Sequence, residues 1–483
     1  MSKTVTDLKT HALSFWVKVV YGTGDWSGAS YGTLRQIFYA IFLTDVVGLE
    51  PRLASVAALI GILWDAVNDP LIGILTDRMR SRWGRRRPFL LFFAIPFGLS
   101  FMLLWWAPPW HSQIALAATV TLAFMVSDTM ETLCSVPFSS LLPELSPDYD
   151  ERTTLTSFRM FFNLLASLVT AVAAPAIVDA ALAAGMTQQQ GYLIVAALFG
   201  GLAAVPYLVI FAVVRERYGA VDRPQETVTF KQTVSTAWAN VPFRFATLIY
   251  MLNWITFDIV ALALPFYLLY WIAQGNMLAS VTLLGVSLPL ESAVFAILLI
   301  TAIIALPFWL WLSHRKGKHI AYIIGMVFWA GVQLGIFSVQ PGHMPLVLWM
   351  SFLAGLSVSA AHVLPDAMFP DVIEWDELRT GRRQEGIYYG VKNFVRKTSG
   401  ALAIFLGLQV LGWFGYHSPP EGATTFTQSP VTLTAIRMLI GPLGALLLFS
   451  AVITTWFYPL TRERHGRIRR LLEKRNGRNG KGD

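Results

Sequence analysis

The sequence predicts an all-α membrane protein in which twelve transmembrane helices form two six-helix halves. Hydrophobic residues make up 55% of the 483 positions and charged residues only 14%, against about 25% in an ordinary soluble domain. The apolar residues gather in twelve stretches, and a bilayer-crossing helix needs about 20 residues. This composition excludes a soluble globular enzyme and a disordered chain, because so much apolar surface needs lipid as its solvent.

The twelve predicted spans follow one another along the whole chain. They cover residues 14–46, 52–78, 88–108, 112–142, 153–184, 190–214, 242–273, 283–313, 320–339, 345–375, 385–415 and 431–459. Because Lys18, Asp25 and Arg35 interrupt the first span, we expect no cleavable signal peptide. The expected domains are an N-terminal half at 1–214, a polar connector at 215–237, a C-terminal half at 238–460 and a basic tail at 461–483.

Positive charge is distributed unevenly over the connections. Lys and Arg are dense in residues 79–87, 314–319 and 376–384 and in the tail, whereas the alternate connections contain only Arg52. The positive-inside rule therefore places both termini in the cytoplasm of a multi-pass plasma (inner) membrane protein. The tail carries most of the net charge of +8, so this charge does not indicate a nucleic-acid partner. A single cysteine, Cys134, excludes an internal disulfide and a Cys-based metal centre.

Two carboxylates lie inside the second span. Asp65 and Asp69 are four residues apart and therefore share one face of a helix. Together with Asn68 and the carbonyl of Ala66, which Pro70 leaves without its helical hydrogen bond, they offer oxygen ligands to a sodium ion or a site for a proton. The alternative is a structural pair that is neutralised by lysines of other helices.

Further charges inside the membrane should neutralise one another across a central cavity between the halves. They are Asp25, Asp128, Glu131, Arg159, Asp258, Lys392, Arg396 and Lys397. Of these, we expect Asp25, Asp128, Glu131, Arg159 and Lys397 to bind the substrate or couple it to the cation. The alternative is that such pairs only clamp helices together.

A second set of charges lies at the cytoplasmic ends of the spans. Asp371 and Glu374 end the tenth span near Arg383, and Asp77 and Arg82 end the second span. Ion pairs between these two sets would close the inner mouth and break when the halves rock apart. The alternative is a solvated membrane edge.

Several segments together carry a family resemblance. They are Tyr21-Gly22, Thr44 to Leu49, Trp64 to Pro70, Arg82-Trp83-Gly84, Arg159, Asp371 to Ile373 and Lys397. These segments resemble the glycoside-pentoside-hexuronide cation symporters, which include the melibiose permeases. The resemblance implies the major facilitator fold and sodium- or proton-coupled uptake. It also implies that Asp65 and Asp69 bind the coupling cation and that Lys397 and Arg159 help to build the sites.

Departures from this family concern the substrate. The positions that match the sugar-binding aspartates of the melibiose permeases are Ala29 and Ser135, and the position of their sugar-stacking tryptophan is Ser139. Other segments, Asp128 to Met130, Val136 to Ser139, Val358 to Pro365 and Met368 to Ile373, resemble the eukaryotic sodium-lysophospholipid symporters of the same superfamily.

These observations predict a secondary active symporter, coupled to Na⁺ or H⁺, that imports a sugar, glycoside or uronide by alternating access. A sodium-coupled carrier of a lysophospholipid or other amphiphile is the first alternative, and a non-transporting membrane sensor is the second. No His pair, Cys-His set or Gly-x-Ser-x-Gly motif lies within the spans, so no enzyme is expected. We expect no cofactor and no metal beyond a possible sodium, and a monomer whose partners are a small-molecule substrate and the bilayer.

Overall fold

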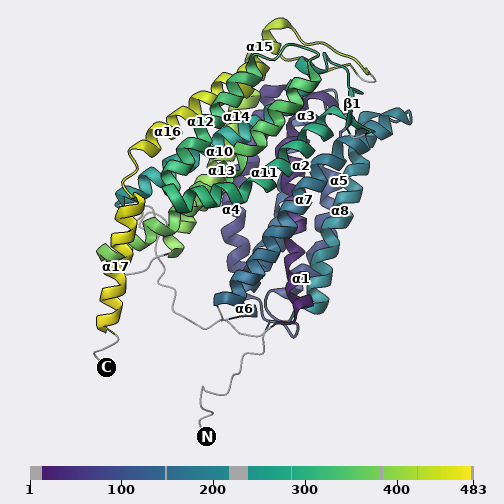
Figure 1. The fold of residues 1–483 in the computed structure, drawn as a ribbon. Coiled ribbons are helices and arrows are strands. Elements are labelled where there is room, and N and C mark those ends of the chain that lie inside the picture. The colour runs from purple at the N-terminus through teal and green to yellow at the C-terminus, as the bar shows by residue number, and fades with distance from the viewer. Residues whose placement is uncertain are drawn as a thin grey trace.

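The computed structural model describes residues 13–146, 149–216, 238–283, 285–380, 385–420 and 423–479. Over these residues the chain forms a bundle of long helices with one short hairpin (Figure 1). Eleven helices of the described part are long and apolar enough to cross a membrane. The predicted all-α membrane fold is thus confirmed, and the first predicted span is the one that does not form a single long helix.

Two sets of helices pack mainly among themselves. The first helix group comprises α1 (Phe15–Gly22), α2 (Gly24–Ile37), α3 (Tyr39–Ile41), the π-helical segment η2 (Phe42–Val46), α4 (Pro51–Arg78), α5 (Arg87–Leu104), α6 (Gln113–Leu145), α7 (Tyr149–Ala183) and α8 (Gln188–Val213). The second helix group comprises α10 (Val241–Phe266), η3 (Tyr267–Ile272), α11 (Leu290–Lys316), α12 (Lys318–Phe337), α13 (Met344–Thr380), α14 (Glu385–Trp413), α15 (Pro430–Met438), η4 (Leu439–Leu443), α16 (Gly444–Trp456) and α17 (Arg462–Asn479). The groups meet chiefly where α4 packs on α14, α7 on α11 and α2 on α10.

The first and the last described helices share one end of the bundle. In Figure 1, α1 begins and α17 ends at the lower end, which we call the terminal end, and α15 marks the opposite end. Large apolar side chains point outward between the two ends: Ile304 and Leu446 are 71% and 63% exposed. An exposed apolar exterior of this kind requires lipid around it, so the chain is an integral membrane protein.

The predicted first span is divided into α1, α2, α3 and η2. The first break falls at Thr23, between Gly22 and Gly24. A Cβ atom added to Gly24 would lie 2.3 Å from the ring of Phe138, so glycine is needed for this close approach to α6. At the other end of the span, η2 holds the buried Asp45, and π-helical turns are frequent at functional sites.

The eighth predicted span, 283–313, begins later in the structure. Its first residues belong to an antiparallel hairpin of β1 (Ser280–Leu283) and β2 (Val286–Pro289). The strands contain several β-branched residues, which favour extended backbone, and Gly285 adopts a positive φ of 82° in the turn. Because Pro289 stands immediately before the helix with an extended backbone, α11 starts at Leu290.

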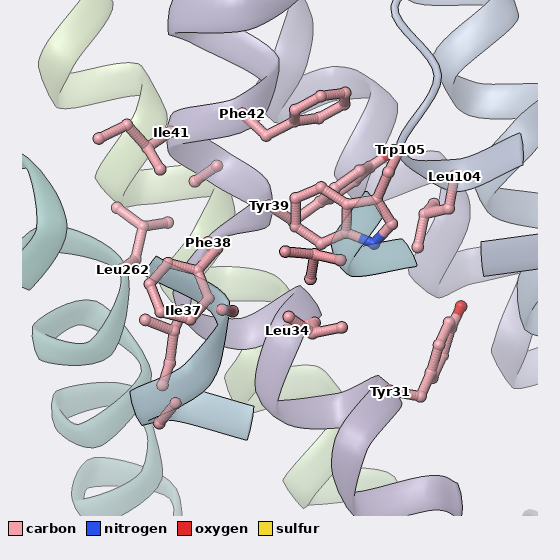
Figure 2. Close-up of a cluster of buried hydrophobic side chains, with 14 of the residues drawn as sticks. Tyr31, Leu34, Ile37, Phe38, Tyr39, Ile41, Phe42, Leu104, Trp105 and Leu262 are labelled. Atoms are coloured by element: carbon pink, nitrogen blue, oxygen red, sulfur yellow. The ribbon is translucent and has the colours of Figure 1, made fainter. Parts of the chain in front are cut away.

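An apolar cluster surrounds the end of the first span (Figure 2). The ring centre of Trp105 lies 5.6 Å from that of Tyr39 in an edge-on contact and 4.9 Å from that of Phe42 in a tilted one. Leu262 of α10 is buried in the same cluster, so the second helix group contributes to it. Because close packing rather than water exclusion joins helices in lipid, this cluster holds the two groups together.

Candidate functional site

A cavity of about 340 Å³ lies between the two helix groups. Residues of α2, α3, η2, α4 and α6 line it on one side, and residues of α10 and α14 line it on the other. Its charged lining residues are Arg35, Asp65, Asp258, Arg396 and Lys397. The cavity therefore has charged groups from both helix groups around one space.

Charged and apolar lining residues occupy different levels of this cavity. Along α14, Lys397 is followed toward the opposite end by apolar lining positions as far as Leu408. On α4, which runs in the other direction, the apolar Ala58 and Ile62 precede Asp65. The cavity is thus amphipathic, with its charges near the middle of the bundle and an apolar chamber toward the opposite end.

The two carboxylates of α4 share one cation from the second helix group. The Lys397 ammonium lies 2.8 Å from Asp65 Oδ2 and also donates to Asp69 Oδ2. Thr132 of α6 donates a hydrogen bond of 3.2 Å to the other oxygen of Asp69. The spacing of four residues on α4 brings the carboxylates to one side of the helix, as expected. The structure adds that Lys397 is the cation that pairs with both carboxylates, which leaves one of their two negative charges uncompensated.

Asn68 is buried, and it does not line the cavity. Its amide nitrogen hydrogen-bonds to no residue in the described part of the chain. Asn68 therefore lies between Asp65 and Asp69 in the sequence of α4, but its side chain does not join theirs at the Lys397 ammonium.

A second charged network crosses between the groups beside the first. Arg396 donates to both oxygens of Asp258 at 2.7 and 3.2 Å, and Gln36 of α2 donates to the same carboxylate. The Arg396 guanidinium also lies 3.8 Å from the centre of the Trp254 ring, a favourable cation-π geometry. A charged residue inside a span, such as Asp258, can be recognised in the sequence as a candidate site residue. Gln36 has no charge, so the sequence did not identify it.

Two ion pairs lie within the first helix group. Arg159 donates to both oxygens of Asp25 at 3.1 and 2.9 Å. Arg35 donates to Asp128 at 3.1 Å. Of these four residues only Arg35 lines the central cavity, and it was not among the residues expected to bind substrate.

Glu131 lies beside α2. One of its carboxylate oxygens is 3.8 Å from the position of a Cβ atom built on Gly28. Like Asp25, Asp128 and Arg159, it is not among the lining residues of the central cavity. Of the five residues expected to bind or couple the substrate, Lys397 is the one that faces this space.

A hydrogen-bonded cluster joins the groups nearer the opposite end. Tyr270 of η3 and Tyr416 both donate to the carboxylate of Asp45 in η2, and Thr44 donates to it at 2.7 Å. Gln409 of α14 also donates to the hydroxyl of Ser55 on α4 at 2.8 Å. Asp45 lies in the segment Thr44 to Leu49, one of those that carry the family resemblance, but its tyrosine partners have no charge by which the sequence could reveal them.

The residues expected to form the inner gate have partners within their own group. Asp371 is 2.6 Å from the Lys318 ammonium, and Glu374 is 2.8 Å from His465 of α17. The Arg82 guanidinium lies 4.7 Å from the centre of the Trp83 ring. Two further gate residues, the side chain of Asp77 and the whole of Arg383, lie outside the described residues.

Comparison with known proteins matches the chain over nearly its full length. The family model described as MFS/sugar transport protein matches residues 20–462. An uncharacterized symporter of Synechocystis is 29% identical over 99% of this chain and all of its own. The sodium-dependent lysophosphatidylcholine symporter 1-A of Danio rerio is 27% identical over 94% of this chain and 88% of its own. A putative glycoside/cation symporter of Escherichia coli is 26% identical over 96% of both chains.

Solved transporter structures share the architecture. The inward-open xylose transporter of Escherichia coli superposes with a TM-score of 0.58 at 15% identity, covering 92% of this chain and 96% of its own. A peptide transporter superposes with a TM-score of 0.60 at 12% identity, covering 95% of this chain and 97% of its own. At such low identity the likeness establishes the fold and nothing about the substrate.

Proposed function

The chain belongs to the MFS/sugar transport protein family and has the major facilitator fold, and we propose that it is a secondary active symporter which moves a solute together with Na⁺ or H⁺. Its relatives are named as symporters and its structural neighbours as transporters, which supports transport rather than an enzymatic reaction. The two helix groups would be the halves that alternate in opening the cavity to either side, divided at residues 215–237.

The observation that carries this proposal is the cluster of Asp65, Asp69 and Lys397 between the groups. Two carboxylates and one ammonium leave one negative charge, which is costly inside a membrane. One Na⁺ or one proton would neutralise the cluster. A bound cation would also compete with Lys397 for the carboxylates and so weaken a contact between the groups. Cation binding and rearrangement of the groups would therefore be linked.

Alternating access is supported by the position of the contacts between the groups. Toward the opposite end, hydrogen bonds from Tyr270 and Tyr416 to Asp45 join the two groups. At the terminal end, Asp371 and Glu374 instead pair with residues of their own, second group. We propose that this arrangement is closed at the opposite end. If both termini are cytoplasmic, as proposed for a plasma (inner) membrane, it faces inward.

Closure of the terminal end would require the predicted gate to form. In that step Asp371 and Glu374 would exchange Lys318 and His465 for basic residues of the first group such as Arg82. The predicted gate residues Asp77 and Arg383 would join the same set of ion pairs. This exchange remains a proposal for the other state of the cycle.

The primary candidate substrate is a sugar, glycoside or uronide. Asp258, Arg396 and Gln36 supply hydrogen-bond donors and acceptors that could pair with hydroxyl or carboxylate groups at the charged level of the cavity. The apolar chamber between Ile62 and Leu408 favours a second candidate, an amphiphile such as a lysophospholipid. A glycoside with an apolar aglycone would use both levels.

Thermal unfolding of the purified protein tests this function directly, because a ligand that binds only the folded state raises the unfolding temperature. A panel of sugars, glycosides, uronides and lysophospholipids is screened with and without Na⁺, at two pH values. We expect one class to stabilise the protein, and more strongly with the coupling cation. Asp65→Asn should lose this cation dependence, while Glu50→Gln, an exposed acid outside the cavity, should keep it. Stabilisation that is independent of both Na⁺ and pH would contradict a symporter.

A further inference from the structure

A separate small cavity lies between the helix groups toward the opposite end. It has a volume of about 50 Å³ and shares no lining residue with the central cavity. Two acids line it: Asp179 near the end of α7 and Glu291 in the first turn of α11. Because α7 belongs to the first group and α11 to the second, this acid pair spans the boundary between the groups.

The two carboxylates lack compensating charge. Both line one cavity of about 50 Å³, and neither forms an ion pair or a hydrogen bond with the described residues. The helix dipole disfavours a negative charge on Asp179, near the C-terminal end of α7, and favours one on Glu291, in the first turn of α11. A cation would relieve the repulsion between Asp179 and Glu291.

An unpaired hydroxyl provides an independent indication of a ligand. Tyr192 of α8 lines this cavity and is only 7% exposed, yet its hydroxyl hydrogen-bonds to no residue in the part of the chain that the structure covers. Although the side chain is buried, its hydroxyl oxygen is not fully enclosed by protein, so it is open to the cavity and available to a ligand. The ring is held in place by stacking on Trp105 at 5.2 Å and by Phe42 at 5.2 Å. The hydroxyl oxygen therefore has a fixed position beside the acids.

We propose that Asp179, Glu291 and Tyr192 form a binding site for one divalent cation, with Ca²⁺ as the best fit. Ca²⁺ prefers carboxylate, carbonyl, hydroxyl and water oxygens in irregular geometry, and its two charges balance the two carboxylates. The side-chain oxygens of Asn276 and Gln188, which also line the cavity, can complete the site with water, for which a space of this size has room.

The affinity should be modest. The described residues contain no group of three or more His, Cys, Asp or Glu side chains arranged for a metal ion. A site with two carboxylates and several neutral oxygens belongs to the weak class of Ca²⁺ sites, with dissociation constants of about 10⁻⁴ to 10⁻³ M. Such a site would fill only where free Ca²⁺ is in the millimolar range.

Binding at this place would act on the transport cycle. The neighbouring Ser292 of α11 donates a hydrogen bond of 2.7 Å to the Val172 carbonyl of α7, so the two helices are already in contact here. A cation held by Asp179 and Glu291 would add a bridge between the groups and stabilise the state that is closed at the opposite end. This inference concerns a site other than the proposed coupling site, and its test does not need the substrate.

Thermal unfolding of the full-length protein, freed of divalent ions with a chelator, provides the test. CaCl₂ is titrated, with choline chloride at equal ionic strength as the salt control. We expect a saturable rise in unfolding temperature for the wild type and at least a tenfold weaker apparent affinity in Asp179→Asn and in Glu291→Gln. Glu50→Gln, an exposed acid outside this cavity, and Asp65→Asn in the central cavity should respond as the wild type does.

Two further readouts separate loss of the site from a folding defect. Without Ca²⁺, Asp179→Asn and Glu291→Gln should be at least as stable as the wild type, because they remove repulsion. Tb³⁺, a luminescent substitute for Ca²⁺, should emit when the aromatic residues of the protein are excited, since Tyr192 lines the cavity and Trp105 stacks on it. Ca²⁺ or Glu291→Gln should suppress that emission. An absent Ca²⁺ response in the wild type, or an equal response in Glu291→Gln, would overturn the proposal.

Discussion

Two carboxylates of α4 and one ammonium of α14 meet beside a central cavity, and their charges do not balance. Lys397 lies 2.8 Å from Asp65 and also pairs with Asp69. At this scale the proposed coupling depends on one uncompensated negative charge, which the membrane interior disfavours. Changes of single charges in this cluster should therefore alter cation dependence before they alter the fold.

Asp69→Asn, and equally Asp65→Asn, should reduce cation-driven accumulation of substrate at least about tenfold, or 1.4 kcal/mol. With one carboxylate removed, Lys397 neutralises the remaining one and no charge is left to attract Na⁺ or H⁺. Accumulation is measured in proteoliposomes under an imposed cation gradient, and exchange without a gradient shows that the variant is inserted. Glu50→Gln serves as the control. If either variant concentrates substrate as the wild type does, the cation-site assignment is wrong.

Lys397→Ala should weaken both cation and substrate binding and lower stability. Removing one member of a fully buried ion pair costs about 3–5 kcal/mol. Because the Lys397 and Asp69 side chains are each 35% exposed, we expect a smaller loss of about 1–3 kcal/mol. Unfolding temperatures measure this loss.

The double variant Lys397→Ala/Asp69→Asn provides the matched control, since it removes one of the two carboxylates that Lys397→Ala leaves unpaired. It should recover part of the lost stability but not the cation response. Equal stability of Lys397→Ala and the double variant would show that the ion pair does not contribute to the fold.

At the scale of single elements, α17 joins the basic tail to the second helix group. Ile468 and Leu472 are buried in the apolar core of that group, and His465 pairs with Glu374 at the end of α13. The sequence identifies residues 461–483 only as a basic tail, although Ile468 and Leu472 give it one apolar side. In the structure that apolar side packs on protein, so α17 is a fixed part of the second group.

Deletion of residues 466–483 should leave initial uptake within about tenfold of the wild type at matched expression, or 1.4 kcal/mol in barrier height. No described residue of the tail lines the central cavity, and the midplane of a bilayer is some 15 Å from its edge. The deletion should nevertheless lower the unfolding temperature, because it removes the buried Ile468 and Leu472. A larger loss of uptake would mean that the tail takes part in the inner gate.

At the scale of the whole molecule, two arrangements of the helix groups must be close in free energy for transport to proceed. The cluster of Asp45, Tyr270 and Tyr416 joins the two groups and would stabilise the proposed arrangement that is closed at the opposite end. A hydrogen bond to a charged group contributes about 1.5–3 kcal/mol. Loss of one or two such bonds would therefore shift the balance between the two arrangements by one to several orders of magnitude.

The double variant Tyr270→Phe/Tyr416→Phe should favour opening at the opposite end, because both hydroxyl donors to Asp45 are removed while the rings remain. A single cysteine replacing the cavity-lining Leu43, in a Cys134→Ser background, reports access. Labelling of this cysteine by a membrane-impermeant maleimide from the opposite side should become about tenfold faster or more. Unchanged labelling would show that these hydroxyls do not hold the end closed. Thr434→Val, an exposed hydroxyl on α15, is the control.

The membrane class, the positions of most spans and the shared face of Asp65 and Asp69 followed from the sequence, because hydropathy and helical spacing depend on residues close together in the chain. Two element boundaries could not be predicted from hydropathy and helical spacing. The division of the first span depends on how closely Gly24 packs on Phe138. The late start of α11 depends on a hairpin that a hydropathy profile cannot distinguish from an apolar helix.

The partners of the charged residues were decided by the tertiary structure alone. Lys397 and Asp69 are 328 positions apart, and many carboxylates and cations in other spans could have paired in their place. The sequence shows that each buried charge needs a partner, because an unpaired charge in lipid is costly. Which partner it finds depends on how α4, α10 and α14 pack against one another. In the same way, the packing of α2 on α10 brings Gln36 to Asp258. The approach of η2 to η3 brings Asp45 to Tyr270, and the packing of α7 on α11 places Asp179 and Glu291 in one small cavity.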